Sequence, residues 1–349
     1  MKKTVQMPAD DSRESLYADL TPNALAALWR SLHELVPSQP RTQFLPWLWR
    51  YDDIRPLLLR AGALISAHEA VRRVLVLENP GAVGSASISP TLYAGLQLIL
   101  PGEVAPAHRH TQSAFRFIVE GQGAFTTVRG ERFNMQPGDL ILTPNFEWHD
   151  HGHEGTEPVV WLDGLDIPLV RALQAGFAET ANNEQQLVDL PPGNNLATWG
   201  SGLRIPGQNG VRSRRVERFI YPFEEWRRAL GSLEKAGVTD ETGCFTLEFL
   251  NPVDGGSVLP TMSAYCQLLP AATATAWQRR TDALVCHVVE GSAFVEIDTF
   301  NQTATPRDTF VIPPWTRFRL QANARLVLFV FSDRITQERL DLWRNQIER

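Results

Sequence analysis

The feature that most constrains the fold of this chain is a strand-and-turn pattern that occurs twice. In each half a threonine precedes a glycine by ten residues, in segments ending FIVEG and HVVEG, and an aspartate precedes a proline by five. The residues are Thr111, Gly121, Asp139 and Pro144 in the first half, and Thr281, Gly291, Asp308 and Pro313 in the second. An all-β unit that has been duplicated explains this repetition, and 349 residues can hold two such units.

Short alternating or apolar runs, separated by Gly, Pro, Asn or Asp, begin at Arg72. In the first half they are RVLVLENP, TLYAGLQLILPGE, FRFIVEGQGAFTTVRGE, GDLILTP and PVVWLDGLD. In the second half they are SAYCQLLP, ALVCHVVEGSAFVEIDTF, DTFVIPPW and FRLQANARLVLFVFSD. Short strands at regular intervals predict a β-sandwich or barrel rather than βαβ units.

Helical spacing of apolar residues appears in three places. The first helix is expected to start with Thr21 as cap and Pro22 at its first position, and to end before Pro37, with irregular structure after it. Its apolar residues are Leu25, Leu28, Trp29, Leu32 and Val36. A Pro/Gly/Asn-rich stretch at 190–210 precedes a second helix with Phe223, Trp226, Leu230 and Leu233 on one side. A third helix, near the C-terminus, carries Ile335, Leu340, Trp343 and Ile347.

Composition narrows the classes of partner and the compartment. A net charge of −6 and a pI of about 5.8 argue against nucleic-acid or membrane-surface partners and favour a small-molecule ligand. The three cysteines, Cys244, Cys266 and Cys286, show no CxxC spacing and are expected to be reduced core thiols. Because no apolar leader or long apolar run is present, we expect a cytoplasmic protein.

Five of the eight histidines fall in two clusters, which suggests a metal site. Alternate residues of a strand share a face, so His108 and His110 can bind one ion while Arg109 faces away. His149 is the best candidate for a third ligand. The alternative is that these are structural histidines satisfied by hydrogen bonds. Three histidines and a water would also suit a zinc hydrolase.

The residues around these histidines resemble known motifs. Gly102, then five residues, then His108, Arg109 and His110, with Gly121 later, resembles the first cupin motif. Gly138, Pro144 and His149 match most of the second. The segments PGEVAPAHRHTQSAFRFIVEG, GDLILTP, WHDHG and WLDGLDIP resemble the gentisate 1,2-dioxygenase family, which includes salicylate and 1-hydroxy-2-naphthoate dioxygenases. The resemblance covers nearly the whole chain and is dense from Arg72 to Val170.

This resemblance implies an all-β bicupin, with two double-stranded β-helix (jelly-roll) barrels and N-terminal, linker and C-terminal helices. We expect residues 1–70 to form a helical and irregular segment, 71–190 a metal-binding cupin, 191–240 a linker with a helix, and 241–349 a metal-free cupin with a terminal helix. The family also implies a homo-oligomer, most simply a tetramer.

The metal ligands depart from the common cupin pattern. Most cupins place a glutamate ligand four residues after the second motif histidine, where this chain has Ala114. Three neutral imidazoles would leave the ion its full charge and about three open positions, which suits a bidentate anionic substrate together with O2. Imidazoles accept several metals, and the resemblance favours Fe(II).

The second half has no matching ligands. If Thr281 is aligned with Thr111, Gln278 and Arg280 fall opposite the two motif histidines and Phe318 falls opposite His149. None of these is an adequate ligand, so this unit is expected to be metal-free and to serve packing or assembly. His287 is then a satisfied core or surface histidine.

Two arginines are candidates for binding a substrate carboxylate. Arg116 lies six residues after His110, and alternation along one strand would point it into the barrel. A buried guanidinium needs an anion, which is either a protein carboxylate or that of a substrate. In the resembled family the arginines at this position and at Arg72 bind the substrate. Arg73 is adjacent, and only one of the two can face inward.

Further site residues follow from strand phase and from the resemblance. Gln97 is in phase with Tyr93 and Gly95, and the family has an aromatic residue, often tryptophan, at Tyr93; a simple core tyrosine is the alternative. His151 could serve as hydrogen-bond donor or proton carrier to O2 or a ring oxygen. His153 is expected to be exposed. Asp163 matches an acidic residue near the family's active site, although a turn or capping role is also open.

The function that these observations favour is an Fe(II)-dependent extradiol-type dioxygenase. It would insert both atoms of O2 into gentisate between C1 and C2 to give maleylpyruvate. The alternatives are an enzyme for salicylate and its 5-substituted forms such as 5-nitrosalicylate, or for 1-hydroxy-2-naphthoate. A metal-binding cupin sensor without turnover is the alternative of another class.

Overall fold

The computed structural model describes residues 12–202 and 216–348, and the chain divides into two compact units, residues 1–41 and 42–349. The first unit contains α1 (Arg13–Leu20), a 3-10 turn η1 (Thr21–Asn23) and α2 (Leu28–Leu35). The single helix expected from Thr21 is therefore wrong. Ala24 adopts a left-handed φ of 53° and ends η1, and Ala27 is extended, so the chain re-enters a helix only at Leu28.

The segment expected to be irregular after Pro37 is ordered. It holds β1 (Trp47–Trp49), α3 (Tyr51–Leu64) and α4 (Ala67–Ala70). Helix α3 lacks the usual local start signal, because Arg50 provides no side-chain cap, and it contains Pro56. Its first turn is stabilised from a distance instead, because the backbone N–H of Tyr51 donates to Oδ1 of Asp308, 2.9 Å away.

The N-terminal half of the second unit consists of two antiparallel sheets. Their strands are β2 (Val74–Val76), β3 (Tyr93–Ile99), β4 (Val104–His110), β5 (Ala114–Glu120), β6 (Ala124–Val128), β7 (Glu131–Asn134), β8 (Leu140–Thr143), β9 (His149–His153), β10 (Val159–Leu165), β11 (Ala178–Thr180) and β12 (Ile220–Tyr221). One sheet has the order β12-β8-β5-β10-β3-β2 and the other β11-β4-β9-β6-β7.

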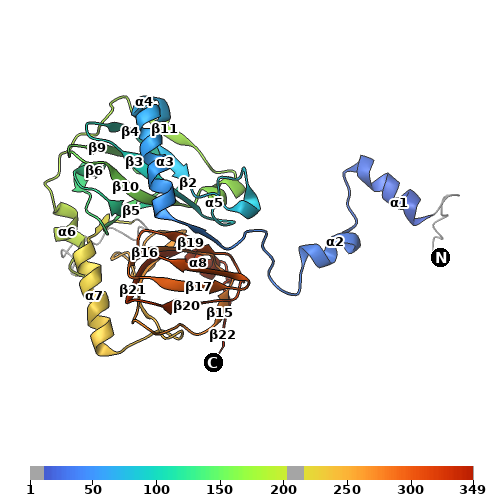
Figure 1. The fold of residues 1–349 in the computed structure, drawn as a ribbon. Helices are drawn as coiled ribbons and strands as arrows, with labels where there is room; N and C mark the ends of the chain where they lie inside the picture. The colour runs from blue at the N-terminus through green and yellow to red at the C-terminus, as the bar shows by residue number, and fades with distance from the viewer. Residues whose placement is uncertain (1–11, 203–215, 349) are drawn as a thin grey trace. The chain divides into compact units, whose positions relative to one another are not determined.

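The C-terminal half repeats this arrangement (Figure 1). Its strands are β13 (Phe245–Glu248), β14 (Ser263–Leu269), β15 (Gln278–Arg280), β16 (Leu284–Glu290), β17 (Ala293–Ile297), β18 (Phe300–Ala304), β19 (Thr309–Ile312), β20 (Phe318–Ala322), β21 (Leu326–Ser332) and β22 (Asn345–Ile347). The orders are β1-β19-β16-β21-β14-β13 and β18-β17-β20-β15-β22. They correspond strand by strand to the first half, which is the duplication that the sequence predicts.

The two halves exchange elements reciprocally. Strand β1, which precedes the first half, pairs with β19 of the second, whereas β12, which precedes the second half, pairs with β8 of the first. Asp308 binds the start of α3, and Asp139 accepts a hydrogen bond of 2.8 Å from the N–H of Phe223 at the start of α7 (Phe223–Ala236). Phe117 stacks on Phe329 between the halves, with centroids 4.3 Å apart. One hydrophobic core therefore spans both halves, and a second core lies within the C-terminal half.

The remaining helical segments are short, namely η2 (Pro80–Ala82), α5 (Ile167–Ala172), α6 (Asn194–Trp199) and α8 (Arg334–Arg339). The connector helix is confirmed as α7, with Trp226 and Leu230 buried; residues 203–210 of the preceding connector lie outside the described residues. The C-terminal helix is shorter than expected: Asp341 has a φ of 57°, and Ile347 lies in β22, which pairs with β15.

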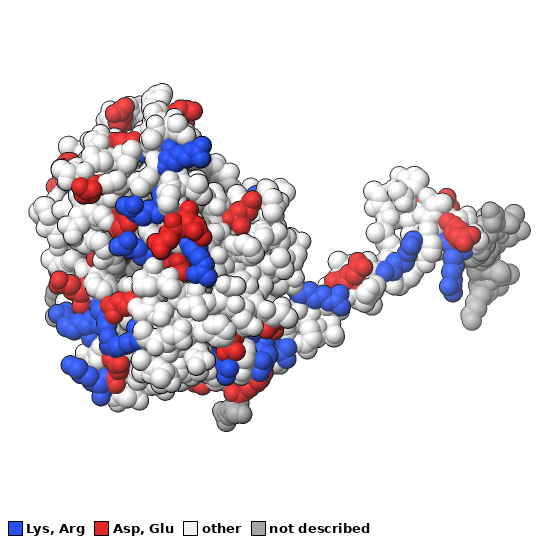
Figure 2. Space-filling model, in the orientation of Figure 1, with Lys and Arg blue, Asp and Glu red and all other residues white. Residues whose placement is uncertain are grey.

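The surface and the cysteines agree with the composition. On the face of the second unit seen in Figure 2, acidic and basic side chains are interspersed rather than gathered into one basic surface. The three cysteines are buried and form no disulfide. Among the helices of the described residues, none has the length and apolar character needed to cross a membrane.

Candidate metal centre

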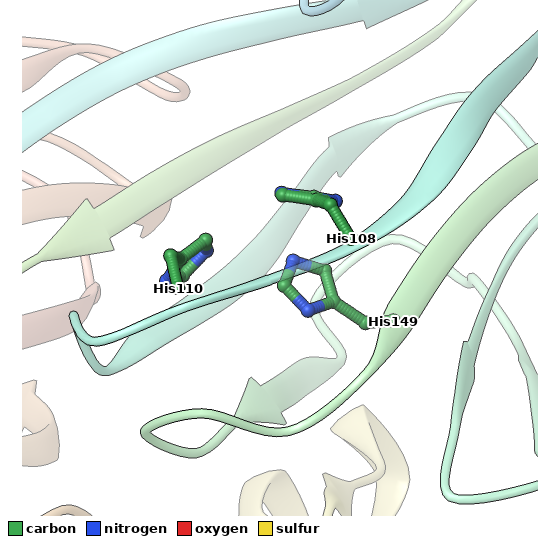
Figure 3. Close-up of side chains that lie close together, drawn as sticks. All are labelled: His108, His110 and His149. Carbon is green, nitrogen blue, oxygen red and sulfur yellow. The ribbon is translucent and has the colours of Figure 1, made fainter. Parts of the chain in front are cut away.

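Three histidines on two neighbouring strands form the site. His108 and His110 project from β4 and His149 from β9, and the antiparallel register places His108 directly opposite His149. One ring nitrogen from each lies within 4.8 Å of the others, and the part of the chain that the structure describes holds no other such group of three possible ligands. Figure 3 shows the side chains close together. Arg109 points away, as expected, and pairs with Glu179 at 2.6 Å.

The hydrogen bonds of these rings favour metal binding. In His110 and His149, Nδ1 lies 2.8 Å from the carbonyl of Gln112 and 2.9 Å from the carbonyl of Glu147. An Nδ1–H that donates to a carbonyl leaves the Nε2 lone pair free for a metal. Nδ1 of His108 lies 3.2 Å from the carbonyl of Pro106 and 2.5 Å from Nη2 of Arg72, which can only donate. Nε2 of His149 is buried without a hydrogen-bond partner, a state that costs about 1–3 kcal/mol unless a ligand relieves it. Three such imidazoles fit a divalent transition metal.

The imidazoles are neutral at physiological pH. Burial, reinforced by the charges of Arg72 and Arg116, lowers the pKa of His108 to about 3. Burial likewise lowers the pKa of His110 to about 4 and holds the pKa of His149 well below its ordinary value. Since a metal ligand must be the neutral imidazole, the site needs no proton release from these residues at neutral pH.

Arg116 reaches the site by a different route from the one expected. It does not share a strand with His110: β4 ends at His110, and Arg116 lies on β5 in the other sheet. Arg116 is 4% exposed, and its Nη1 donates to Oγ1 of Thr143 at 2.6 Å. Nε lies 3.7 Å from Oδ1 of Asp163 and has no hydrogen-bond partner. The guanidinium is therefore balanced by a protein carboxylate and still has an unused donor.

The register of β10 with β3 and β5 places Asp163 and the β3 residues beside Arg116. Asp163 lies opposite both Gly95 and Arg116, in the middle of β10, so it is neither a turn residue nor a cap. It accepts a hydrogen bond from Nε1 of Trp161 at 3.0 Å. Burial raises the pKa of Asp163 to about 6, and the charge of Arg116 opposes that rise. Burial, and after it the charge of the nearby Asp163, raises the pKa of Tyr93.

Gln97 lies one step further along the same face of β3. It is 4% exposed and stands opposite Trp161 of β10 and Val74 of β2. Alternation puts Gln97, Gly95 and Tyr93 on one face, as predicted.

The two adjacent arginines have separate partners. Nη2 of Arg72 donates to the carbonyl of Pro106 at 2.8 Å and lies 2.5 Å from Nδ1 of His108. Arg73 instead forms a two-bond ion pair with Glu103, at 2.6 and 2.9 Å. Burial and the charge of Arg116 lower the pKa of Arg72 to about 10, so Arg72 stays charged at neutral pH. Arg72 is thus the arginine that contacts a candidate ligand.

His151 lies beside the three ligands. Its ring centroid is 5.8 Å from that of His149 and 5.5 Å from that of Trp161, and both ring nitrogens are buried without a hydrogen-bond partner. Burial holds its pKa well below the ordinary value. Two free nitrogens on a neutral ring can donate one hydrogen bond and accept another.

His153 is not exposed, contrary to the prediction. It is 3% exposed, Nε2–H donates to the carbonyl of Glu157 at 2.6 Å, and Nδ1 accepts the N–H of Gly155 at 3.0 Å. These bonds hold the turn between β9 and β10, a role that the sequence HGHEG only hints at. Thr143 and Trp161, which hold Arg116 and Asp163, were also not predicted; their strand phase in GDLILTP and WLDGLD was the available signal.

The C-terminal half keeps the geometry without the ligands. Gln278 lies opposite Phe318 in the β15–β20 pairing, as His108 lies opposite His149. Arg280 pairs with Asp282 at 2.6 Å. His287 is buried, with Nδ1 2.9 Å from Oγ1 of Thr309, as expected of a satisfied core histidine.

Comparison with known proteins agrees with this geometry. Residues 95–165 match the family described as Cupin domain. The chain is 42% identical over 344 residues to gentisate 1,2 dioxygenase 1 of Aquipseudomonas alcaligenes, covering 99% of each. It is 33% identical to 5-aminosalicylate 1,2-dioxygenase of a Comamonas species, covering 95% of this chain and 90% of the relative. Salicylate 1,2-dioxygenase of Pseudoaminobacter salicylatoxidans, solved with gentisate, superposes with a TM-score of 0.92 at 34% identity, covering 100% of this chain and 97% of that one.

Fold, histidine cluster and relatives together define a bicupin of the ring-cleaving 1,2-dioxygenase class. Within that class, the chain belongs to the gentisate 1,2-dioxygenase family.

Proposed function

We propose that this protein is an Fe(II)-dependent gentisate 1,2-dioxygenase. It adds both atoms of O2 to gentisate and opens the ring between C1 and C2 to give maleylpyruvate. The observation that carries the proposal is the meeting of three neutral imidazoles with a buried arginine, Arg116, that retains an unused donor. The full-length likeness to gentisate 1,2-dioxygenases supports the choice of substrate.

In this proposal His108, His110 and His149 hold Fe(II). When bound, the ion supplies a Lewis-acidic centre and a path for electrons from the ring to O2. Ala114, at the position of the usual fourth cupin ligand, adds no protein charge. Residues 71–190 then form the catalytic cupin, 191–240 the linker and 241–349 the metal-free cupin.

The chain's own residues bind and orient the substrate. Arg116 and Arg72 bind the carboxylate of gentisate, since Arg72 contacts His108 and the charge of Arg116 acts on all three ligand histidines. Asp163 holds Arg116 in place without occupying its Nε donor. Tyr93 and Gln97 contact the ring from β3. Between them, the neighbours of Gly95 leave no room for a side chain, because an added Cβ would lie 2.5 Å from Val74 Cγ1 and 2.8 Å from Tyr93 Oη.

His151 supplies hydrogen bonds to the reacting oxygens. As a neutral ring with both nitrogens unpartnered, it can accept a hydrogen bond from the 2-hydroxyl at one nitrogen. The other nitrogen can donate to oxygen, where negative charge develops during ring opening.

The second candidate is a salicylate-type enzyme, favoured by the superposition on salicylate 1,2-dioxygenase. Such an enzyme would accept rings without a 5-hydroxyl, including 5-nitrosalicylate, or 1-hydroxy-2-naphthoate. The test is reconstitution with Fe(II) without oxygen, followed by oxygen-electrode assays with gentisate, salicylate, 5-nitrosalicylate and 1-hydroxy-2-naphthoate. The highest kcat/KM identifies the substrate class. Oxygen uptake with none of them, although iron is bound, would favour a metal-binding sensor.

We also propose that the protein acts as a cytoplasmic homotetramer. Helix α2 exposes Leu28, Trp29 and Leu35 within one chain, which supports an assembly that covers them. Sedimentation at micromolar concentration tests this, and a 39.1 kDa monomer alone would exclude it.

A further inference from the structure

A buried aspartate links the C-terminal half to the metal site. Asp166, which follows β10 and is 2% exposed, accepts a hydrogen bond from the hydroxyl of Thr261 with one oxygen, at 2.5 Å. Its other oxygen accepts the backbone N–H of Ser113 at 2.9 Å. Thr261 belongs to the C-terminal half and precedes β14, whereas Ser113 belongs to the N-terminal half. One carboxylate therefore bridges two segments that are far apart in the chain.

The bridged segment carries part of the metal site. Ser113 lies in the three-residue connection between β4 and β5, directly after Gln112. The carbonyl of Gln112 accepts the Nδ1–H of His110 at 2.8 Å, the bond that orients this ring. A connection that shifts on loss of Asp166 would move this carbonyl, and the His110 ring with it.

Thr261 is itself held firmly, so it can act as an anchor. The hydroxyl of Thr336, on α8, donates to the carbonyl of Thr261 at 2.9 Å, and Arg339 donates to the neighbouring carbonyl of Pro260. Two hydrogen bonds from α8 therefore fix the anchor within the metal-free half.

We infer that Asp166 and Thr261 are positioning residues through which the metal-free half holds His110 in its coordinating orientation. The inference rests on the proposed metal site. In this view the metal-free cupin contributes to the metal site of the other cupin, because Thr261 fixes the connection that follows His110.

The duplication offers a matched control. In the C-terminal half Asp333 follows β21 as Asp166 follows β10, and its carboxylate accepts the N–H of Ala283 at 2.9 Å. The connection that Asp333 holds begins after Arg280. Arg280 is the counterpart of His110 but is not a metal ligand. Asp333→Ala therefore removes the same kind of bond without reaching the metal site.

The test measures metal affinity separately from activity. Co(II) is titrated into apo wild type, Asp166→Ala, Thr261→Val, Thr261→Ser and Asp333→Ala in competition with a chelator, and thermal unfolding is recorded for each apo protein. We expect Kd for Co(II) to rise by about 10–100-fold in Asp166→Ala and by about 3–10-fold in Thr261→Val. Thr261→Ser, which keeps the hydroxyl, and Asp333→Ala should stay within about twofold of wild type, although Asp333→Ala loses thermal stability.

The outcomes separate this inference from the proposed function. If wild type fails to bind about one Co(II) per chain, the metal site itself is wrong. If wild type binds Co(II) but Asp166→Ala and Thr261→Val keep its affinity, the positioning role is wrong and the metal site stands. If Asp166→Ala does not fold, the pair Thr261→Val and Thr261→Ser decides: equal affinities overturn the inference, and weaker binding by the valine variant alone supports it.

Discussion

Arg116 and Asp163 stand opposite each other on β5 and β10, with Nε of the arginine 3.7 Å from Oδ1 of the aspartate. That distance is within ion-pair range but too long for a hydrogen bond. The carboxylate therefore balances the buried charge of Arg116 without occupying its donors. Because Nη1 is committed to Thr143, the unused Nε is what distinguishes a ligand-binding arginine from a purely structural one.

Arg116→Ala should impair substrate binding while leaving the metal in place. Breaking one side of a buried, charge-assisted pair costs about 3–5 kcal/mol, which corresponds to roughly two to four orders of magnitude in kcat/KM. Arg116→Lys should also be impaired, since a point charge does not reproduce the planar fork. Steady-state kinetics with gentisate and iron analysis are the measurements. Normal iron content with a loss below about threefold would make Arg116 structural and move the carboxylate-binding role to Arg72.

Iron analysis should find about one iron per chain, because the described residues hold one group of three ligands. Replacing His108, His110 or His149 with alanine should abolish both iron binding and oxygen uptake, since two imidazoles hold Fe(II) weakly. Gln278→Ala, at the counterpart of His108, is the control and should keep both. Two stoichiometric irons in wild type would contradict the asymmetry between the halves.

Gly95→Ala should displace Tyr93. A Cβ at this position would lie 2.8 Å from Oη of Tyr93 and 2.5 Å from Cγ1 of Val74, so both side chains must move. We expect KM for gentisate to rise by about tenfold, which corresponds to roughly 1.4 kcal/mol, with normal iron content. Tyr93→Phe removes one of the two clashes, so the double variant should recover part of the loss. If the effects of Gly95→Ala and Tyr93→Phe on KM were strictly additive, Gly95→Ala would not act through the side chain of Tyr93.

His287 should make the protein less stable in mild acid. Burial lowers its pKa to about 3, whereas the unfolded chain takes up this proton below about 6.5. The unfolded state therefore binds more protons between these values, and the free energy of unfolding falls as pH falls through that window. For one histidine this amounts to about 2 kcal/mol between pH 7.5 and pH 5, at up to about 1.4 kcal/mol per pH unit.

Urea unfolding at pH 7.5 and pH 5 measures this effect. His287→Phe introduces the residue that the first half has at the equivalent position, Phe117. Between pH 7.5 and pH 5 this variant should lose about 2 kcal/mol less stability than wild type. His68→Gln, at an exposed position on α4, is the matched control and should follow wild type. A His287→Phe protein with the wild-type pH dependence would show that His287 titrates normally in the folded state.

Local spacing in the sequence was sufficient for the repeated strands and for two of the three ligands. A strand sends alternate side chains to one face whatever surrounds it, so HRH predicts two ligands and an outward arginine without any tertiary information. The second histidine cluster offered His149 as the third ligand, and the family resemblance supported His149, His151 and Asp163. Turn residues likewise marked most strand boundaries of the larger sheets.

The tertiary structure decided the features that depend on groups distant in the chain. At the start of helix α3, Asp308 accepts a hydrogen bond from the N–H of Tyr51, 257 residues away. No capping residue near Tyr51 in the sequence therefore predicts where this helix begins. Arg116 enters the site from the opposite sheet because the chain turns after His110. Asp166 holds a ligand-bearing connection only because the second half places Thr261 against it. Such hydrogen bonds form between segments that only the folded core brings together. The periodicity of a short stretch of sequence therefore cannot predict them.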